Sequence, residues 1–148
     1  MAEAIRQGDI PGVQLRYRQD LSVSQGEAWR RLTSTSALES WLCDEATMAA
    51  EEGSELEWRG SPDLGPECVE LGSIVAVEAP RLLVASIRQP DWSAATRLRI
   101  ELSATEIGCE VSVLQNGFEH LPFSDSLTIW EAYRRRWRAA LERLAASA

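Results

Sequence analysis

Side chains able to carry out acid–base, nucleophilic or metal chemistry are few in this sequence and widely spaced. His120 is the single histidine and lies in a stretch typical of a loop, where packing or exposure is commoner than catalysis. Cys43, Cys68 and Cys109 fit reduced thiols better than a disulfide or a zinc site, because they share no metal-binding spacing. We therefore predict no catalytic residue, no metal ligand and no cofactor, and we favour a protein that is not an enzyme.

Carboxylates are numerous, but their positions in the sequence indicate exposure to solvent rather than a catalytic role. Glu57, Glu70 and Glu101 fall on the polar phase of stretches in which apolar and polar residues alternate, so we expect them to be solvated. Between residues 39 and 78, Arg59 is the single base among many acidic residues. This stretch predicts a solvated surface, with a docking surface for another protein as the alternative.

Aromatic side chains permit a more definite interpretation, because aromatic walls with a few polar groups are what small apolar ligands need. The chain has six tryptophans, and Gln115 and Arg134 are the polar groups best placed to contact a ligand. The candidate ligand-binding residues are Trp41, Trp58, Val75, Leu98, Ile100, Gln115, Phe118, Trp130, Tyr133, Arg134 and Trp137. The alternative, that these side chains simply fill the core, stays open.

A predicted helix from Ser126 to about Ala146 positions many of these residues. Apolar side chains recur there at three- and four-residue steps and form one broad stripe. They are Leu127, Trp130, Tyr133, Trp137, Ala140, Leu141 and Leu144. The same helix carries a cluster of arginines that we expect mostly in solvent, namely Arg134, Arg135, Arg136 and Arg138. Roughly twenty residues make a helix of about 30 Å, long enough to cover one face of a sheet.

The preceding chain predicts strands joined by turns, with two short helices near its start. Residues 13–23 alternate as a strand, and Ser24 and Glu27 have the spacing of a capping box that begins the first short helix. A second short helix ends near Trp41. Further strands are expected around residues 46–49, 56–58, 69–77, 82–87, 96–102 and 109–113. Loops are expected at residues 60–66 and 89–93, the second exposing Trp92.

Length and charge bound the class of protein. A chain of 148 residues, 45% hydrophobic and 26% charged, predicts one folded domain over residues 1–148, with a flexible start over residues 1–11. The net charge of −8 argues against nucleic acid as a partner, because phosphate binding needs clustered cations. The sequence shows neither an apolar run long enough to span a membrane nor a secretory signal, so we expect a cytoplasmic location.

Five stretches, in their order along the chain, resemble the heat-shock protein 90 ATPase activator homologues of the START-like, SRPBCC (Bet v 1-like) superfamily. They are AWRRLT (28–33) with LESW (38–41), GSEL (53–56), GSIV (72–75) with APRLL (79–83), residues 108–118, and WRAALERL (137–144). Two positions depart from the family pattern. Gln115 stands where the family often has His, which removes a candidate general base, and Arg136 stands where it has Gly.

The resemblance implies an α+β helix-grip fold, as does the order of the predicted elements. Its parts are a curved antiparallel sheet of about seven strands, two short helices after strand one, and a long C-terminal helix with a cavity beneath it. Three functions stay open. We favour a binder of a small hydrophobic ligand over a chaperone-associated interaction module, and both over an enzyme of the polyketide cyclase or hydrolase kind. The protein is expected to be a monomer or a homodimer, with Trp92 as a candidate interface anchor.

Overall fold

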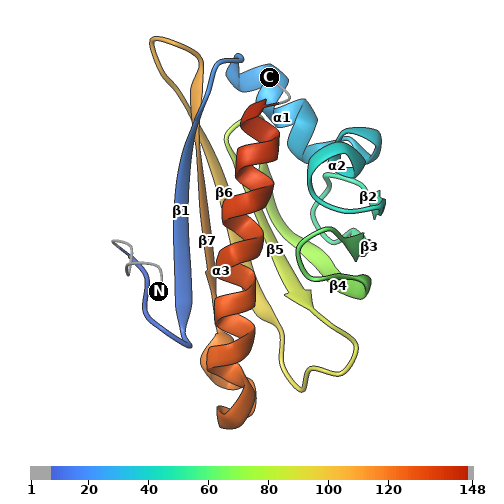
Figure 1. Ribbon diagram of the computed structural model, residues 1–148. Helices are drawn as coiled ribbons and strands as arrows, with labels where there is room; N and C mark the ends of the chain where they lie inside the picture. Colours follow the sequence, from blue (N-terminus) through green and yellow to red (C-terminus); the bar gives the residue numbers. More distant parts are fainter. Residues whose placement is uncertain (1–7, 147–148) are drawn as a thin grey trace.

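The computed structural model describes residues 8–146, in which a long helix lies across one face of a seven-stranded sheet (Figure 1). The strand order is β1-β7-β6-β5-β4-β3-β2, and each neighbouring pair is antiparallel. The strands are β1 (Gln14–Leu21), β2 (Glu45–Met48), β3 (Glu55–Ser61), β4 (Gly65–Glu78), β5 (Leu82–Arg88), β6 (Thr96–Ala104) and β7 (Cys109–Asn116). The helices are α1 (Gln25–Thr33), α2 (Thr35–Trp41), the 3-10 helix η1 (Phe118–His120) and α3 (Phe123–Ala146).

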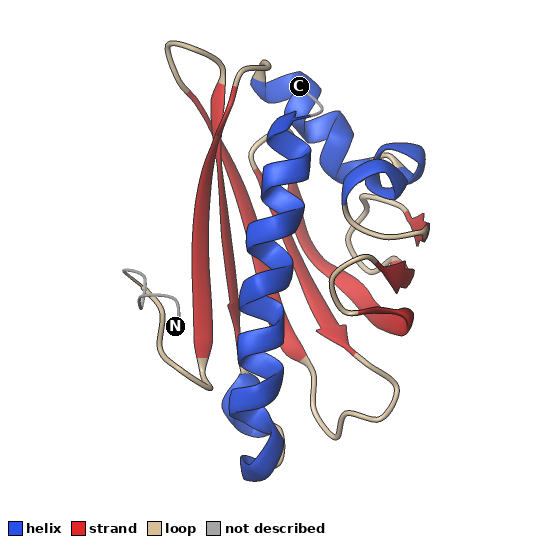
Figure 2. Cartoon of the chain, in the orientation of Figure 1, coloured by secondary structure: helices blue, strands red, loops and turns tan. Residues whose placement is uncertain are grey.

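The predicted helix-grip arrangement is confirmed. Figure 2 shows α3 in front of the sheet, with α1 and α2 at one end of it. Of the segment predicted to be flexible, residues 1–7 lie outside the described residues. Asp9 is buried, and its Oδ1 accepts a hydrogen bond from the backbone N–H of Arg16 at 2.9 Å.

Of the two hydrogen bonds of the capping box predicted before α1, the one to the Ser24 hydroxyl forms. The Ser24 hydroxyl accepts a hydrogen bond from the backbone N–H of Glu27 at 3.1 Å, as expected for an N-cap. The Glu27 carboxylate pairs instead with Arg30 and Arg31 on the same helix. The hydrogen bond from Arg30 is the main reason why the pKa of Glu27 is lowered to about 2.

The helix α3 begins at Phe123 rather than at the predicted Ser126. Its predicted apolar stripe is buried except for Leu127, which is 49% exposed. Figure 1 shows that the start of α3 extends past the end of the sheet. The prediction that the arginines of this helix lie in solvent is wrong for Arg134 and Arg136, which are both buried.

A β-bulge in β4 changes which side chains face the helix. The register with β5 shifts between Ile74 and Ala76, which leaves Val75 as the extra residue. Before the bulge Glu70 and Ile74 are buried, and after it Val77 packs against the core. A single alternation through this strand placed Glu70 in solvent. That prediction is wrong, because the bulge reverses the phase of the alternation.

The loop predicted at residues 60–66 is shorter than expected. Strand β3 continues to Ser61 and β4 begins at Gly65. The hydroxyl of Ser61 accepts hydrogen bonds from the backbone N–H groups of Asp63 at 3.2 Å and Leu64 at 3.0 Å. A side chain that satisfies turn amides in this way allows a tight connection, so β3 and β4 form a hairpin.

Gly72 allows β4 and β5 to approach each other closely. A Cβ at this position would lie 1.8 Å from the backbone carbonyl oxygen of Ser86, which cannot rotate away. We expect Gly72→Ala to destabilise the protein by about 1–3 kcal/mol in urea unfolding, because the strands must separate. Gly26→Ala in α1 is the control, since a Cβ there meets nothing within 4 Å. It should stabilise by about 0.5–1 kcal/mol, and equal effects of the two changes would contradict the close approach.

Candidate functional site

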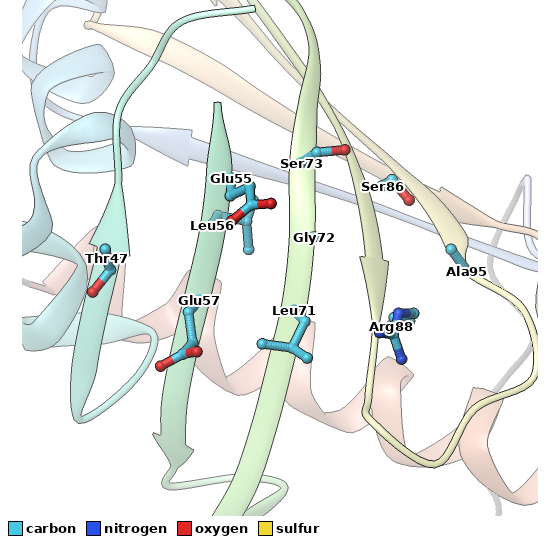
Figure 3. A pocket seen from close by; sticks show the side chains of 10 residues that line it. All are labelled: Thr47, Glu55, Leu56, Glu57, Leu71, Gly72, Ser73, Ser86, Arg88 and Ala95. Carbon is cyan, nitrogen blue, oxygen red and sulfur yellow. The ribbon is translucent and has the colours of Figure 1, made fainter. Parts of the chain in front are cut away.

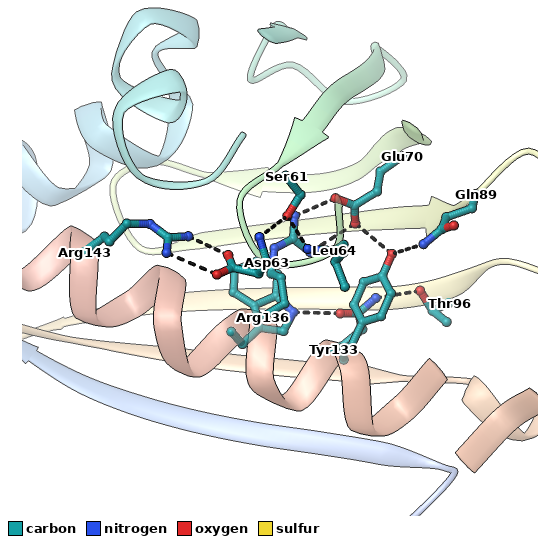
Figure 4. Close-up of polar contacts among 11 residues, drawn as sticks. Ser61, Asp63, Leu64, Glu70, Gln89, Thr96, Tyr133, Arg136 and Arg143 are labelled. Carbon is teal, nitrogen blue, oxygen red and sulfur yellow. Dashed lines mark hydrogen bonds and ion pairs between the residues drawn. The ribbon is translucent and has the colours of Figure 1, made fainter. Parts of the chain in front are cut away.

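A buried ion pair joins Glu70, on the inner face of the sheet, to Arg136 on α3 (Figure 4). Glu70 on β4 is 2% exposed and Arg136 on α3 is 0% exposed. The Nη1 of Arg136 donates to Oε2 of Glu70 at 3.1 Å, and its Nη2 donates to Oε1 at 2.5 Å. Burial by itself would lower the pKa of Arg136, but the Glu70 carboxylate more than offsets this and raises it. Arg136 therefore stays charged inside the protein.

Tyr133 and Gln89 extend this pair. The Tyr133 hydroxyl donates to Oε2 of Glu70 at 3.0 Å and accepts a hydrogen bond from Nε2 of Gln89 at 3.2 Å. Burial, together with the negative charge of Glu70, raises the pKa of Tyr133 well above its usual value. The hydroxyl therefore stays protonated at neutral pH and donates its hydrogen bond to Glu70.

Aromatic rings surround the Arg136 guanidinium. Its central carbon lies 4.7 Å from the ring centre of Trp137, 5.6 Å from that of Tyr133 and 5.8 Å from that of Trp58. Contacts of this kind stabilise a desolvated cation. We name the group formed by Trp58, Glu70, Gln89, Tyr133, Arg136 and Trp137 the inner cluster.

Trp92 closes the inner cluster, contrary to the prediction that its loop exposes it. The side chain is 9% exposed, and its ring centre lies 5.6 Å from that of Tyr133. Phe118 packs against the same Tyr133 ring, also at 5.6 Å between centres. Trp92 is drawn into the core by these rings, so it offers little surface for the interface suggested by the sequence.

A second chain of hydrogen bonds links the inner cluster to the middle of the sheet. Trp137 Nε1 donates to Oε1 of Gln115 at 2.8 Å, and Gln115 Nε2 donates to the hydroxyl of Thr96 at 2.9 Å. Thr96 in turn donates to the backbone oxygen of Ile87 at 2.8 Å. Gln115 therefore has both ends of its amide occupied, which holds the Trp137 ring in one orientation.

Two donors in the inner cluster have no hydrogen-bond partner among the described residues. They are the indole Nε1 of Trp58 and the Nε of Arg136, on side chains that are 3% and 0% exposed. A buried donor left unpaired costs about 1–3 kcal/mol, so native proteins seldom leave one without an acceptor. Among residues 8–146, Trp58 Nε1 and Arg136 Nε therefore lack the acceptor that buried donors usually have.

The family model for activator of Hsp90 ATPase homolog 1-like proteins matches residues 22–148. The chain belongs to this family. The resemblance found in its sequence stretches is thereby confirmed. A search of curated proteins returned no match.

Solved structures share the fold of this family member at low sequence identity. A protein from Rhodobacter sphaeroides is 20% identical, with a TM-score of 0.72 over 92% of each chain. A protein from Chromobacterium violaceum is also 20% identical, with a TM-score of 0.72 over 90% of this chain and 96% of that one. DynU16, a protein in the dynemicin biosynthetic locus, is 12% identical, with a TM-score of 0.70 over 88% of this chain and 46% of DynU16.

The structure brings several of the predicted ligand-binding residues of this family member together. Those in or against the inner cluster are Trp58, Gln115, Phe118, Tyr133 and Trp137. Leu98 and Ile100 are buried on the inner face of β6, and Val75 is half-buried at the bulge. Whether these side chains bind a ligand stays a prediction.

The other predicted residues are engaged elsewhere. Trp41 Nε1 donates to the backbone oxygen of Arg31 at 3.0 Å, and Trp130 Nε1 donates to that of Gln14 at 2.7 Å. The guanidinium of Arg134 lies 4.8 Å from the ring centre of Trp130 and forms an ion pair with Asp9 at 3.3 Å. Arg134 therefore ties the N-terminal segment to α3.

Sequence reasoning missed four members of this site, namely Glu70, Gln89, Trp92 and Arg136. A signal for Arg136 was present, because it lies three residues after Tyr133 and four before Ala140, on the apolar stripe itself. A charge on an apolar stripe predicts a buried partner. No comparable signal identified Glu70 as that partner, since the bulge in β4 decides which way it faces.

The opposite face of the sheet carries a hollow of about 580 Å³. Figure 3 shows its lining residues on β2 to β5 and at the end of the β5–β6 loop, with α3 behind the sheet. They are Thr47, Glu55, Leu56, Glu57, Leu71, Gly72, Ser73, Ser86, Arg88 and Ala95. None of the predicted ligand-binding residues is among them, so this hollow is separate from the inner cluster.

Two cysteines lie within the electrostatic reach of the buried charge pair. Burial raises the pKa of Cys43 to about 12 and that of Cys68 to about 11. We expect Cys68 to react with iodoacetamide at pH 8 about ten to a hundred times more slowly than an ordinary thiol of pKa 9.0, because less of it is thiolate, with the rate rising until about pH 11. Timed alkylation followed by peptide mass spectrometry measures this rate. A rate that levels off by pH 9 would contradict it.

Over residues 8–146, no three His, Cys, Asp or Glu side chains are grouped to hold a metal ion. No helix described there combines the length and the apolar character needed to cross a membrane.

Proposed function

We propose that this protein binds a small, largely apolar molecule between α3 and the inner face of the sheet, at the inner cluster. The observation that carries the proposal is the charge pair of Glu70 and Arg136, which is buried among aromatic rings. A buried ion pair is often no more stable than apolar side chains of the same volume. Its presence in the core therefore favours a functional role over a purely structural one.

The arrangement supports binding and orientation better than catalysis. Tyr133 stays protonated because its pKa is raised, and Gln115 has both ends of its amide engaged. A polar centre within apolar walls can orient a ligand without transferring a proton. The enzyme alternative, of the polyketide cyclase or hydrolase kind, needs a group that exchanges protons near neutral pH, which neither of these two side chains supplies.

Native mass spectrometry of the protein purified from its host tests this proposal, followed by denaturing extraction of any bound compound. We expect a bound species in the parent protein and lower occupancy in Tyr133→Phe, which removes the hydroxyl and keeps the ring. Arg135→Met, an exposed position on the same helix, should retain full occupancy. Absence of any bound compound from the parent, in both measurements, would overturn the proposal.

The family match favours a second candidate, an interaction module that stimulates a heat-shock protein 90 ATPase. The acidic residues of β2 and β3 would supply its contact surface, since Glu45 and Glu55 are exposed there. Chaperone ATPase rates with and without the protein test this candidate. We expect stimulation that Glu45→Gln/Glu55→Gln weakens, and an unchanged rate with the parent would reject it.

A further inference from the structure

We infer that the ligand of the inner cluster is a neutral molecule that presents a hydrogen-bond acceptor, such as a carbonyl oxygen, to the indole N–H of Trp58 and the Nε–H of Arg136. This inference rests on the proposed function and narrows it to a chemical class. Three features of the inner cluster carry it: the unpaired groups, the balance of charge and the aromatic walls.

The unpaired groups of the cluster are donors. Trp58 Nε1 and Arg136 Nε have no partner among the described residues, although both side chains are buried. The carboxylate of Glu70 and the hydroxyl oxygen of Tyr133 already accept hydrogen bonds. Glu70 accepts from Arg136 and from Tyr133, and the Tyr133 oxygen accepts from Gln89. A ligand that supplies an acceptor would pair with the two donors that have none in the described part of the chain.

The charge of the cluster is balanced without a ligand. Glu70 contributes one negative charge and Arg136 one positive charge, in a two-point contact. An anionic ligand would compete with Glu70 for Arg136 and leave an uncompensated negative charge in the core, which is costly. A cationic ligand would place a second positive charge beside Arg136. A neutral ligand avoids both costs.

The walls of the cluster favour a flat, apolar body. Three ring centres lie within 6 Å of the guanidinium carbon of Arg136, those of Trp58, Tyr133 and Trp137. Aromatic rings pack best against other flat surfaces in offset or edge-on arrangements. A planar conjugated ketone therefore matches both the walls and the two donors. The competing explanation is an internal water that accepts from both donors.

Three probes of nearly equal shape separate these possibilities, namely 2-acetylnaphthalene, 2-isopropenylnaphthalene and 2-naphthoate. The ketone and the alkene differ by a carbonyl oxygen in place of a methylene group, and the carboxylate adds a charge. We expect the ketone to bind roughly tenfold to a hundredfold more tightly than the alkene by calorimetry, because it makes two further hydrogen bonds. The carboxylate should bind more weakly than the ketone.

The indole N–H resonance of Trp58 gives a readout that does not depend on affinity alone. Trp58→Phe assigns this resonance in the nitrogen–proton correlation spectrum of the folded protein. It should move downfield when the ketone binds and stay in place with the alkene. Trp58→Phe should also reduce the preference for the ketone, whereas Trp29→Phe on α1, the matched control, should retain it.

The outcomes distinguish this inference from the proposed function. Equal affinity for ketone and alkene, or tightest binding of the carboxylate, would overturn the inferred ligand class and leave the binding function in place. Failure of all three probes to bind, with the Trp58 N–H contacting only a long-lived water, would overturn the inferred class. Combined with an empty protein in native mass spectrometry, that result would overturn the proposed function as well.

Discussion

Arg136→Met is expected to destabilise the protein by about 3–5 kcal/mol, because it leaves the Glu70 carboxylate buried without its cation. After this change the Glu70 carboxylate keeps the hydrogen bond from the Tyr133 hydroxyl, at 3.0 Å. Methionine is close in length to the arginine stem, so the loss reports the missing charge more than a missing volume. Urea unfolding followed by tryptophan fluorescence measures the effect.

The matched control is Arg135→Met, one residue away on the exposed side of α3, which should change stability by less than about 0.5 kcal/mol. The double variant Glu70→Leu/Arg136→Met removes both charges and should recover to within about 1–2 kcal/mol of the parent. The recovered double variant should nevertheless lose the ligand binding that we propose for the inner cluster. If Arg136→Met changed the free energy of unfolding as little as Arg135→Met does, the Glu70–Arg136 pair would not be desolvated.

Trp137→Ala is expected to cost about 3–5 kcal/mol, because it opens a cavity in the centre of the core. The ring is 1% exposed, lies against the Arg136 guanidinium and donates to Gln115. Trp137→Phe keeps most of the ring volume and loses the N–H group, which leaves Oε1 of Gln115 unpaired. That variant should cost about 1–3 kcal/mol.

Leu127→Ala on the same helix is the control for this series, since that side chain is 49% exposed and should tolerate truncation within about 0.5 kcal/mol. Thermal or urea unfolding of the three variants gives the comparison. If Trp137→Phe cost as much as Trp137→Ala, the hydrogen bond to Gln115 would outweigh the packing of the ring. If neither change mattered, the core would not be organised around this side chain.

Local patterns were sufficient to predict most of the fold. Strands such as β6 and β7 alternate strictly, and α3 repeats its apolar residues at helical spacing, so pattern and burial agree there. The N-cap at Ser24 was predictable because its hydrogen bond joins residues three apart. These features depend on neighbours in the chain, and local sequence contains that information.

Residue patterns alone predicted the helix-grip arrangement, the aromatic richness of the inner face and the placement of Gln115, Tyr133 and Trp137 on it. The contact of Glu70 with Arg136 and the packing of Trp92 against Tyr133 depend on the assembled tertiary structure. Glu70 and Arg136 are 66 residues apart, and their contact depends on the bulge in β4 and on how α3 lies across the sheet. A charge is buried only when a distant partner compensates it, so the burial of either residue is a property of the assembled fold.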